Sequence, residues 1–459
     1  MSRCSIDVII VNYRGAADTL QALARLAQWT HGTLWLVDNS AHEADMVAET
    51  AELQQAVVSL RASAGAMEST SSVIASAPSV MASTPFVIAS EARQSMASGL
   101  MDRHGLRPRD DEEPGRPRDG EEAGRRRDDG EVGRPGDDGE VGRPRDDGAA
   151  GQACVRLLAP GANLGFGRAC NLAFAESGAE FILLLNPDAR ICADDLLLLA
   201  RTLEEQPQLA GVSPKIYWDE QRSFVLPAAF AQTPWYHVAQ ALATRSRRLA
   251  QWAARRGVLR TMRKMAGSKF FQVDFVAGSV LLLRRSAVLQ AGGLFDPDYF
   301  MFYEDSDLSL RLRRAGYKLA IVPGATAEHE YRHKAFKAEL MTQSQQHYFS
   351  KQYPLFYRWS GKLSRVPRLA GSVDLNAWFK VLTQPVSSAE EFTHQTGAAG
   401  VLAFSPTMLL MPAIFRPSVA QARPFDEDEW GLLEPGPYTA LLVGPVSSMA
   451  LSWVYFLKA

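Results

Sequence analysis

Short apolar runs alternate with segments of helical periodicity near the start of the chain. Residues 8–11 and 34–37 are uninterrupted apolar runs with β-branched members, which is typical of strands buried on both faces of a sheet. Between them, residues 18–29 carry leucine and alanine at helical spacing. This β-α-β order predicts a parallel sheet with right-handed crossover connections.

The same pattern resumes later in the chain. Further strands are expected at 155–158, 181–185, 211–216, 273–283 and 318–322, and helices at 167–177, 194–205 and 308–315. We therefore expect an α/β fold, with a Rossmann-like, mostly parallel sheet flanked by helices, over residues 1–60 and 152–360.

The segment 61–151 interrupts this pattern between the second and third predicted strands. It is first rich in serine, alanine and methionine, and then repeats a nine-residue unit four times between Gly115 and Ala150. The repeats lack the paired glycines and the large apolar residue of calcium-binding β-rolls. Because they offer almost no apolar side chain to bury, they cannot offset the entropy of ordering, and we predict a disordered low-complexity insertion.

Residues 370–459 lie beyond the α/β pattern. Residues 437–443 and 451–457 are predicted to pair as a hairpin in a small β-rich C-terminal region of unknown role. The stretch 438–457 is uncharged and apolar, so its alternative interpretation is a membrane span. Gly444 and Pro445 near its centre favour a strand, a turn and a second strand.

Composition narrows the class of protein. The 459 residues are 46% hydrophobic and 22% charged, as in folded soluble proteins, and a net charge of −2 gives no overall field to attract nucleic acid. The four cysteines have no C-x-x-C spacing, which fits a reducing compartment. The N-terminus lacks the apolar core of a signal peptide, so we expect a cytoplasmic protein.

Polar residues follow four of the predicted strands. They are Asn12 and Tyr13, Asp38 and Asn39, Asn163, and Asn186 with Asp188. In an open parallel sheet, ligands bind outside the carboxyl ends of the strands, so these residues predict one polar site at one edge. Asp188 has two interpretations, a ligand of Mg²⁺ or Mn²⁺ or a helix cap, and Asp194 is better placed to be the cap.

Two further segments combine residues of chemical interest. Residues 163–171, which include Gly165 and Asn171, form a glycine-rich loop that opens a helix; such a loop either lets backbone approach a phosphate or simply turns the chain. Glu304 and Asp305 follow an aromatic run at the start of a helix. Acids there suit the helix dipole, but aromatic neighbours also desolvate a carboxylate and make it a better general base.

His329 and His333 follow the strand predicted at 318–322. Their spacing of four would allow them to share a helix face and a metal. His329 is nearer to the strand end and is the expected ligand, whereas a solvated side chain is the default for His333.

Taken in order, these motifs resemble the inverting GT-A-fold glycosyltransferases, a large family that includes bacterial rhamnosyltransferases and galactofuranosyltransferases. The matching pieces are 11–13, 37–40, 163–167 with Asn171, 185–189, 278–279, 292–296 and 302–308. The resemblance covers about 1–60 and 152–350. It implies a nucleotide-sugar half up to about residue 217 and an acceptor half from about residue 270.

The resemblance also implies roles for single residues. Asp38 would hydrogen-bond the pyrimidine base, and Asp188 would meet the metal within Asn186-Pro-Asp188, where the family usually has an acid in place of Asn186. Asp305 would be the general base, with Glu304 as its rival. The acceptor side would be lined by Gly278 and Ser279, the late metal ligand would be His329, and the remaining nucleotide-sugar contacts would be Asn12, Tyr13, Asn163, Gly165 and Asn171.

The implied reaction moves a sugar from a dTDP- or UDP-linked donor to a glycan or lipid-linked glycan by single displacement with inversion, for example as a rhamnosyltransferase in cell-surface polysaccharide synthesis. One alternative is a non-catalytic glycan- or nucleotide-binding protein that kept the fold; the presence of Asp188, Glu304 and Asp305 argues against it. A second alternative is a nucleotidyltransferase, but residues 11–15 lack its glycine-rich loop. No nucleic-acid partner is expected.

Residues 245–269 carry nine basic side chains interleaved with leucine, tryptophan and methionine. This pattern indicates a basic amphipathic helix on an anionic membrane surface, or equally a solvated helix of the acceptor half. Membrane contact would place the protein peripherally at the inner face of the cell membrane and favour a lipid-linked acceptor.

Overall fold

The computed structural model describes residues 5–26, 29, 31–40, 42–63, 154–227, 231–243, 246–330, 337–363, 375–407, 410, 412–444 and 451–459. The predicted disordered insertion lies outside these residues, apart from 61–63, which end a helix. His333 and Arg245 also lie outside them.

The elements follow one another in an α/β order up to residue 363. In the first part they are β1 (Ile6–Asn12), α1 (Ala16–Arg25), β2 (Thr33–Asp38), α2 (Val47–Ser63), β3 (Cys154–Leu158), α3 (Gly165–Glu176), β4 (Phe181–Leu185), β5 (Ala189–Ile191), α4 (Ala193–Glu205) and β6 (Leu209–Tyr217). They continue with α5 (Pro234–Ala243), α6 (Arg247–Ala266), β7 (Phe271–Val273), β8 (Val280–Arg284), α7 (Arg285–Gln290), α8 (Glu304–Arg314), β9 (Lys318–His329), α9 (Lys337–Gln352) and α10 (Pro354–Leu363).

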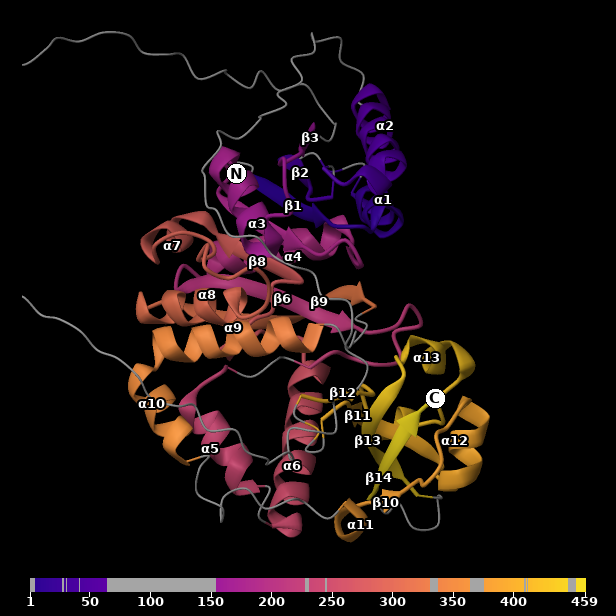
Figure 1. The fold of residues 1–459 in the computed structure, drawn as a ribbon. Helices are drawn as coiled ribbons and strands as arrows, with labels where there is room; N and C mark the ends of the chain where they lie inside the picture. The colour runs from indigo at the N-terminus through magenta and orange to yellow at the C-terminus, as the bar shows by residue number, and fades with distance from the viewer. Residues whose placement is uncertain are drawn as a thin grey trace, which may run out of the picture. The chain divides into compact units, whose positions relative to one another are not determined.

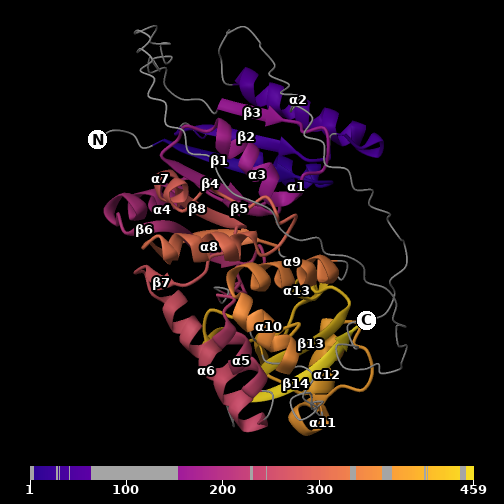
Figure 2. The same cartoon turned by 60° about the vertical axis from the view of Figure 1, so that its left-hand side comes forward.

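Within the described residues, nine strands form one sheet in the order β3-β2-β1-β4-β8-β6-β9-β5, with β7 also paired to β9. Neighbours among β3, β2, β1 and β4 are parallel, as are β6 and β9. Strand β8 runs antiparallel between β4 and β6, and β5 and β7 are antiparallel to β9. Figure 2 shows β3, β2, β1 and β4 side by side. The expected α/β fold with a large sheet flanked by helices is confirmed.

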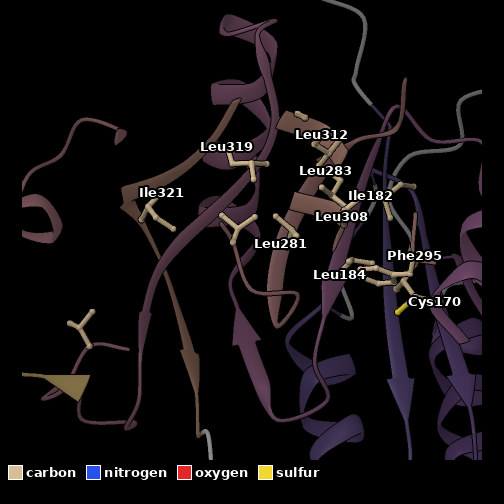
Figure 3. Packing of buried hydrophobic residues seen from close by; sticks show 14 of the residues in the cluster. Cys170, Ile182, Leu184, Leu281, Leu283, Phe295, Leu308, Leu312, Leu319 and Ile321 are labelled. Carbon is tan, nitrogen blue, oxygen red and sulfur yellow. The ribbon is translucent and has the colours of Figure 1, made fainter. Parts of the chain in front are cut away.

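Each face of the sheet is covered by its own helices. On one face, Val8, Leu183 and Leu282 pack with apolar residues of α1, α2 and α4. On the other, Ile9, Leu184 and Leu283 pack with apolar residues of α3, α6, α7 and α8. Figure 3 shows side chains of β4 and β8 in this second layer, together with Leu308 and Leu312 of α8. The alternation along each strand explains why the runs are continuously apolar: both faces are buried.

Two expectations about the elements need correction, and several helices, α2 among them, were not predicted. Residues 273–283 do not form one strand, because the chain turns at Gly278 and Ser279 between β7 and β8. The helix expected at 308–315 begins earlier, at Glu304, so Glu304 and Asp305 both lie in its first turn. Helix α2 was not expected, because it buries few side chains, chiefly Leu53 and Val57, and has little amphipathic pattern.

The C-terminal region contains a second sheet. Its elements are α11 (Leu375–Trp378), β10 (Lys380–Val381), α12 (Ala389–Thr396), β11 (Gly400–Ser405), β12 (Ile414–Phe415), α13 (Glu427–Leu432), β13 (Gly436–Val443) and β14 (Leu451–Lys458). Strands β13 and β14 pair antiparallel over their full lengths, which confirms the predicted hairpin. No helix in the described part of the chain has the length and apolarity required to cross a membrane.

Candidate active site

The carboxyl ends of three neighbouring parallel strands meet at one edge of the sheet. Asn12, at the end of β1, is in register with Asp38, at the end of β2. On the other side of β1, Ile10 is in register with Leu185, which directly precedes Asn186. Asp38 and the loop that carries Asp188 therefore lie at the same edge, as expected from the parallel order.

The residues at the ends of β1 and β2 form hydrogen bonds with one another. The Asp38 carboxylate is fully buried and accepts hydrogen bonds from Asn12 Nδ2 (3.0 Å), Ser40 Oγ (2.9 Å) and Thr50 Oγ1 (2.9 Å). Asn12 is also fully buried, and its Oδ1 accepts from Thr19 Oγ1 at 2.9 Å. Asp38 thus fixes the loop after β2 to α2, and its expected hydrogen bond to a pyrimidine base remains a prediction.

Tyr13 is the outward-facing member of this strand end, with 43% of its surface exposed. The next residue, Arg14, has a positive φ of 53° and forms ion pairs with Glu43 and Asp45. A bulky residue in the left-handed region is unfavourable unless the surroundings fix it. The two ion pairs supply that restraint, so the turn after β1 presents Tyr13 at the edge.

Asn39, predicted only as a polar residue after the second strand, joins the first strand ends to the glycine-rich loop. Its Nδ2 donates to Asn163 Oδ1 (2.9 Å) and to the Gly165 carbonyl (3.3 Å), and its Oδ1 accepts from the Leu164 amide (3.0 Å). Asn163 Oδ1 also accepts from the Gly165 amide at 3.0 Å. Segments separated by more than a hundred residues therefore form one continuous surface at the sheet edge.

Gly165 and Asn171 hold the loop that leads to α8. Gly165 has φ +76°, and a Cβ atom there would lie 2.1 Å from the Phe300 carbonyl oxygen, so no other residue fits. Asn171 binds the backbone of Phe295 through both ends of its amide, at 2.8 and 3.0 Å. In the structure, the group that approaches the glycine is thus the chain at Phe300, and nucleotide contact by these two residues remains a prediction.

The expected acceptor-side residues connect the two halves of the site. The Asn186 amide donates to the Ser279 carbonyl (2.8 Å), and the Gly278 amide donates to Asp305 Oδ2 (3.4 Å). Gly278 also lies next to the Phe166 ring of the glycine-rich loop. Asp305 is therefore linked through two adjacent residues to the loop that carries Asp188.

The start of α8 is strained and places two carboxylates side by side. Phe302 and Tyr303 both have positive φ, 70° and 66°, directly before the helix. Consecutive non-glycine residues in this region store strain, which is often found at functional sites. Glu304 follows with 6% exposure, and its Oε2 has no hydrogen-bond partner among the described residues; Asp305 is partly exposed.

Burial is the main cause of the raised pKa values of Glu304 and Asp305. It raises the pKa of Asp305 to about 6, although hydrogen bonds from the backbone of Gly278 and Ser306 oppose the change. Burial and, second, the charge of Asp305 raise the pKa of Glu304 to about 8. Near neutral pH, Asp305 is then mostly a carboxylate and Glu304 mostly a neutral acid.

Asp307, the third acid in the first turn of α8, has a structural role. Asp307 is fully buried and accepts from Arg311 Nε (2.6 Å) and Gln352 Nε2 (2.6 Å). Arg311 in turn donates to backbone carbonyls of residues 291, 293 and 294. The Asp307–Arg311 pair therefore fastens the preceding loop and α9 to α8.

Asp188, which directly precedes β5, lies beside His329, the last residue of β9. Ala189 is in register with His329, and His329 Nε2 lies 3.1 Å from Asp188 Oδ1. This distance is that of a hydrogen bond or ion pair between the two side chains. Because two adjacent ligands of an ion with bond lengths of about 2.1 Å also lie about 3 Å apart, it is equally compatible with two ligands of a divalent cation. The imidazole nitrogen and carboxylate oxygen of the pair suit Mn²⁺ better than Mg²⁺, which prefers oxygen ligands.

A second acidic group is a weaker metal candidate. Asp296, Asp298 and His347 bring ligand atoms within 4.8 Å of one another. However, Lys351 already forms ion pairs with Asp296 and Asp298. The ammonium group supplies the positive charge that a metal would bring.

Comparisons with known proteins agree with this geometry. Residues 174–348 match the family described as glycosyltransferase like family 2. The N-acetylglucosaminyl-diphospho-decaprenol L-rhamnosyltransferase of Mycobacterium tuberculosis is 30% identical over 206 residues, which are 39% of this chain and 60% of that protein. Rhamnosyltransferase WbbL of Escherichia coli is 30% identical over 182 residues, 38% of this chain and 63% of that protein. The chain thus spans less than two thirds of either relative.

Two solved structures share a distant likeness. One is GalNAc-T7 with UDP, GalNAc and Mn²⁺, at 10% identity and a TM-score of 0.39 over 81% of this chain and 52% of that one. The other is the mannosyltransferase PcManGT of Pyrobaculum calidifontis with GDP-Man and Mn²⁺, at 12% identity and a TM-score of 0.38 over 81% and 72%. Residues 174–348 thus resemble the glycosyltransferase-like family 2, two rhamnosyltransferases are 30% identical to parts of this chain, and the predicted family resemblance is confirmed.

Proposed function

We propose that this protein transfers a sugar from a nucleoside-diphosphate sugar to a hydroxyl of a glycan or lipid-linked glycan, with inversion at the anomeric carbon. The observation that carries this proposal is the position of Asp305. It is a partly exposed carboxylate at the start of α8, tied to Gly278 and, through Ser279, to the loop with Asn186 and Asp188.

In this proposal Asp305 removes the proton from the acceptor hydroxyl. A general base must be ionised and yet basic enough to take a proton, and a pKa of about 6 meets both conditions near neutral pH. Glu304 is buried, and its pKa of about 8 keeps it mostly protonated there. We therefore assign the base to Asp305 and regard Glu304 as a neutral neighbour that keeps negative charge from accumulating.

The donor half of the site lies at the ends of β1, β2 and β4. Tyr13 offers an exposed aromatic face, and Asp38, Asn163 and Asn186 belong to the surrounding network. Asp188 and His329 would hold Mg²⁺ or Mn²⁺, which when bound supplies positive charge against the departing diphosphate. The nitrogen ligand favours Mn²⁺ in this assignment.

The substrate class is taken from the relatives. Both named bacterial relatives are rhamnosyltransferases, and one acts on a decaprenol-linked diphosphate sugar. We extend this to a dTDP- or UDP-linked donor, with L-rhamnose as the first sugar to test, and to a role in cell-surface polysaccharide synthesis. The described cysteines Cys154, Cys170 and Cys192 are free thiols, which supports a reducing, cytoplasmic setting.

The test is single-turnover sugar transfer by Asp305→Asn and by wild-type protein, across a panel of nucleotide sugars with Mn²⁺. Loss of the base should slow transfer by ~10²–10⁴-fold while nucleotide binding survives. Asp194→Asn is the matched control, because Asp194 is an exposed acid in the first turn of α4 and should leave the rate unchanged.

Glu304→Gln separates the two carboxylates, since it should keep most of the transfer rate. Full activity of Asp305→Asn together with a slow Glu304→Gln would move the base to Glu304. Unchanged transfer in both variants would remove both carboxylates from the mechanism, and a wild-type protein that binds a nucleotide sugar but transfers none would be a non-catalytic binding protein.

A further inference from the structure

Helix α6 carries an unusual density of positive charge. Its twenty residues, Arg247–Ala266, include six arginines and one lysine and no acidic residue. The whole chain has a net charge of −2, so this charge is concentrated locally. A helix of this length extends about 30 Å.

The helix has two distinct faces. Its buried stripe consists of Ala250, Ala254, Val258, Met262 and Met265. The opposite face is exposed and consists of Arg248, Leu249, Trp252, Arg255, Arg256, Arg260 and Arg263, which we call the outer face of α6. Trp252 is 58% exposed near the middle of the basic residues. Large apolar side chains on an exposed basic face indicate a partner that offers both negative charge and apolar surface.

The protein does not neutralise this charge within its described residues. None of the arginines of the outer face forms an ion pair with a carboxylate there, whereas Arg190, Arg222, Arg311 and Arg416 elsewhere all do. Arg256 instead lies over the ring of Trp252, at 5.3 Å from its centroid. A solvated helix normally intersperses acids at i,i+4, and their absence leaves self-repulsion that an external anion would relieve.

Exposed tryptophans also occur on the neighbouring helices. Trp235 of α5 is 80% exposed and Trp359 of α10 is 66% exposed. Figures 1 and 2 both place α5 beside α6 and α10 beside α5. Tryptophan and tyrosine are the residues that are enriched at membrane–water interfaces.

We propose that the outer face of α6 docks on an anionic phospholipid bilayer, with Trp252 and Leu249 entering the interface and the arginines meeting lipid phosphates. Charge complementarity selects an anionic partner, and the apolar side chains within the basic face select a lipid surface over a nucleic acid.

This surface is continuous in sequence with the acceptor side of the site. After α6, the chain forms β7 and then reaches Gly278, whose amide contacts Asp305. That a bilayer on α6 presents a lipid-linked acceptor to Asp305 is an expectation that rests on the proposed function. Bilayer binding itself requires no transfer activity, so the two proposals fail separately.

The experiment is co-sedimentation of the full chain with vesicles of phosphatidylcholine alone, or of equal parts phosphatidylcholine and phosphatidylglycerol. Wild-type protein should bind the anionic vesicles, and added salt should weaken binding. Arg255→Glu/Arg260→Glu should lower the binding constant about thirtyfold or more, corresponding to about 2 kcal/mol. Both side chains are exposed, so the melting temperature should be unchanged.

Arg201→Glu/Lys318→Glu is the matched control, because it reverses two exposed charges on α4 and β9 and should bind like wild type. Equal binding of both double variants, or equal binding to neutral and anionic vesicles, overturns the proposal. Tighter binding of a single-stranded RNA than of anionic vesicles at the same salt would overturn the choice of a lipid partner.

Discussion

Replacing Glu304 with glutamine should stabilise the protein at alkaline pH. Glu304 is 6% exposed, its Oε2 lacks a hydrogen-bond partner among the described residues, and the Asp305 carboxylate lies next to it in sequence and space. Burial, with a second contribution from Asp305, raises the pKa of Glu304 from 4.5 to about 8. Glutamine keeps the shape of the protonated acid but cannot ionise.

The sign follows from proton binding. In the unfolded chain the carboxyl loses its proton near pH 4.5, whereas in the folded protein it keeps the proton up to about pH 8. Between these values the folded state binds more protons, so the free energy of unfolding decreases as pH rises through this interval. At about 1.4 kcal/mol for each pH unit, the full interval amounts to at most about 5 kcal/mol. Relaxation and water entry around a buried charge reduce this penalty, and roughly 2 kcal/mol is expected.

The assay is thermal unfolding of wild type and Glu304→Gln at a series of pH values from about 5 to about 9, a range that covers most of the titration. A difference of roughly 2 kcal/mol corresponds to roughly 4–8 °C in melting temperature for a domain of this size. The variant should exceed wild type by that amount at the alkaline end and lose its advantage at the acid end. Glu204→Gln, at an exposed position of α4, is the control and should follow wild type throughout. Parallel curves for Glu304→Gln and wild type would refute a buried, protonated Glu304.

Two further substitutions test the metal pair and the glycine-rich loop. In calorimetry, Asp188→Ala should abolish Mn²⁺-dependent binding of a nucleoside diphosphate, and His329→Ala should weaken this binding. Asp298→Ala is the control and should bind normally, because a lysine already neutralises its acidic group. The reverse pattern would move the metal to the group of Asp296, Asp298 and His347. Gly165→Ala should destabilise the protein by roughly 2 kcal/mol or more in denaturant unfolding, because its φ is +76° and Phe300 occupies the space of a Cβ atom. Gly257→Ala, in open space on α6, should instead be neutral or stabilise by roughly 0.5–1 kcal/mol, and equal effects of the two changes would contradict the close approach at Gly165.

The strands of the large sheet were predictable because burial on both faces leaves a simple signal. The runs at 8–11, 34–37 and 181–185 lie within β1, β2 and β4. The signal fails where an apolar run continues through a turn. Residues 273–283 contain little polarity to mark the bend, so their division into β7 and β8, with Gly278 and Ser279 between them, could not be read from composition.

The site was predictable as a set of strand ends but not as a network. Parallel order alone brings Asn12, Asp38 and Asn186 to one edge. Which polar atoms bind one another depends on loop conformation, and no spacing rule connects Asn39 to Asn163 across more than a hundred residues. The two positive φ angles before Glu304 are equally invisible in the sequence, since phenylalanine and tyrosine give no hint of a left-handed backbone.

The network divides the polar residues of the edge into two groups. Asn12, Asp38 and Asn39 are buried, and their side chains are engaged by other parts of the protein. Replacing any of them leaves buried donors or acceptors without partners, at about 1–3 kcal/mol for each group, so activity lost in such a variant would not identify a ligand contact. Tyr13 and Asp305 remain partly exposed at the same edge, where a substitution can act on substrate without first acting on the fold. The chemistry of the site therefore depends on a few side chains, and the larger polar set around them keeps three distant segments of the chain in place.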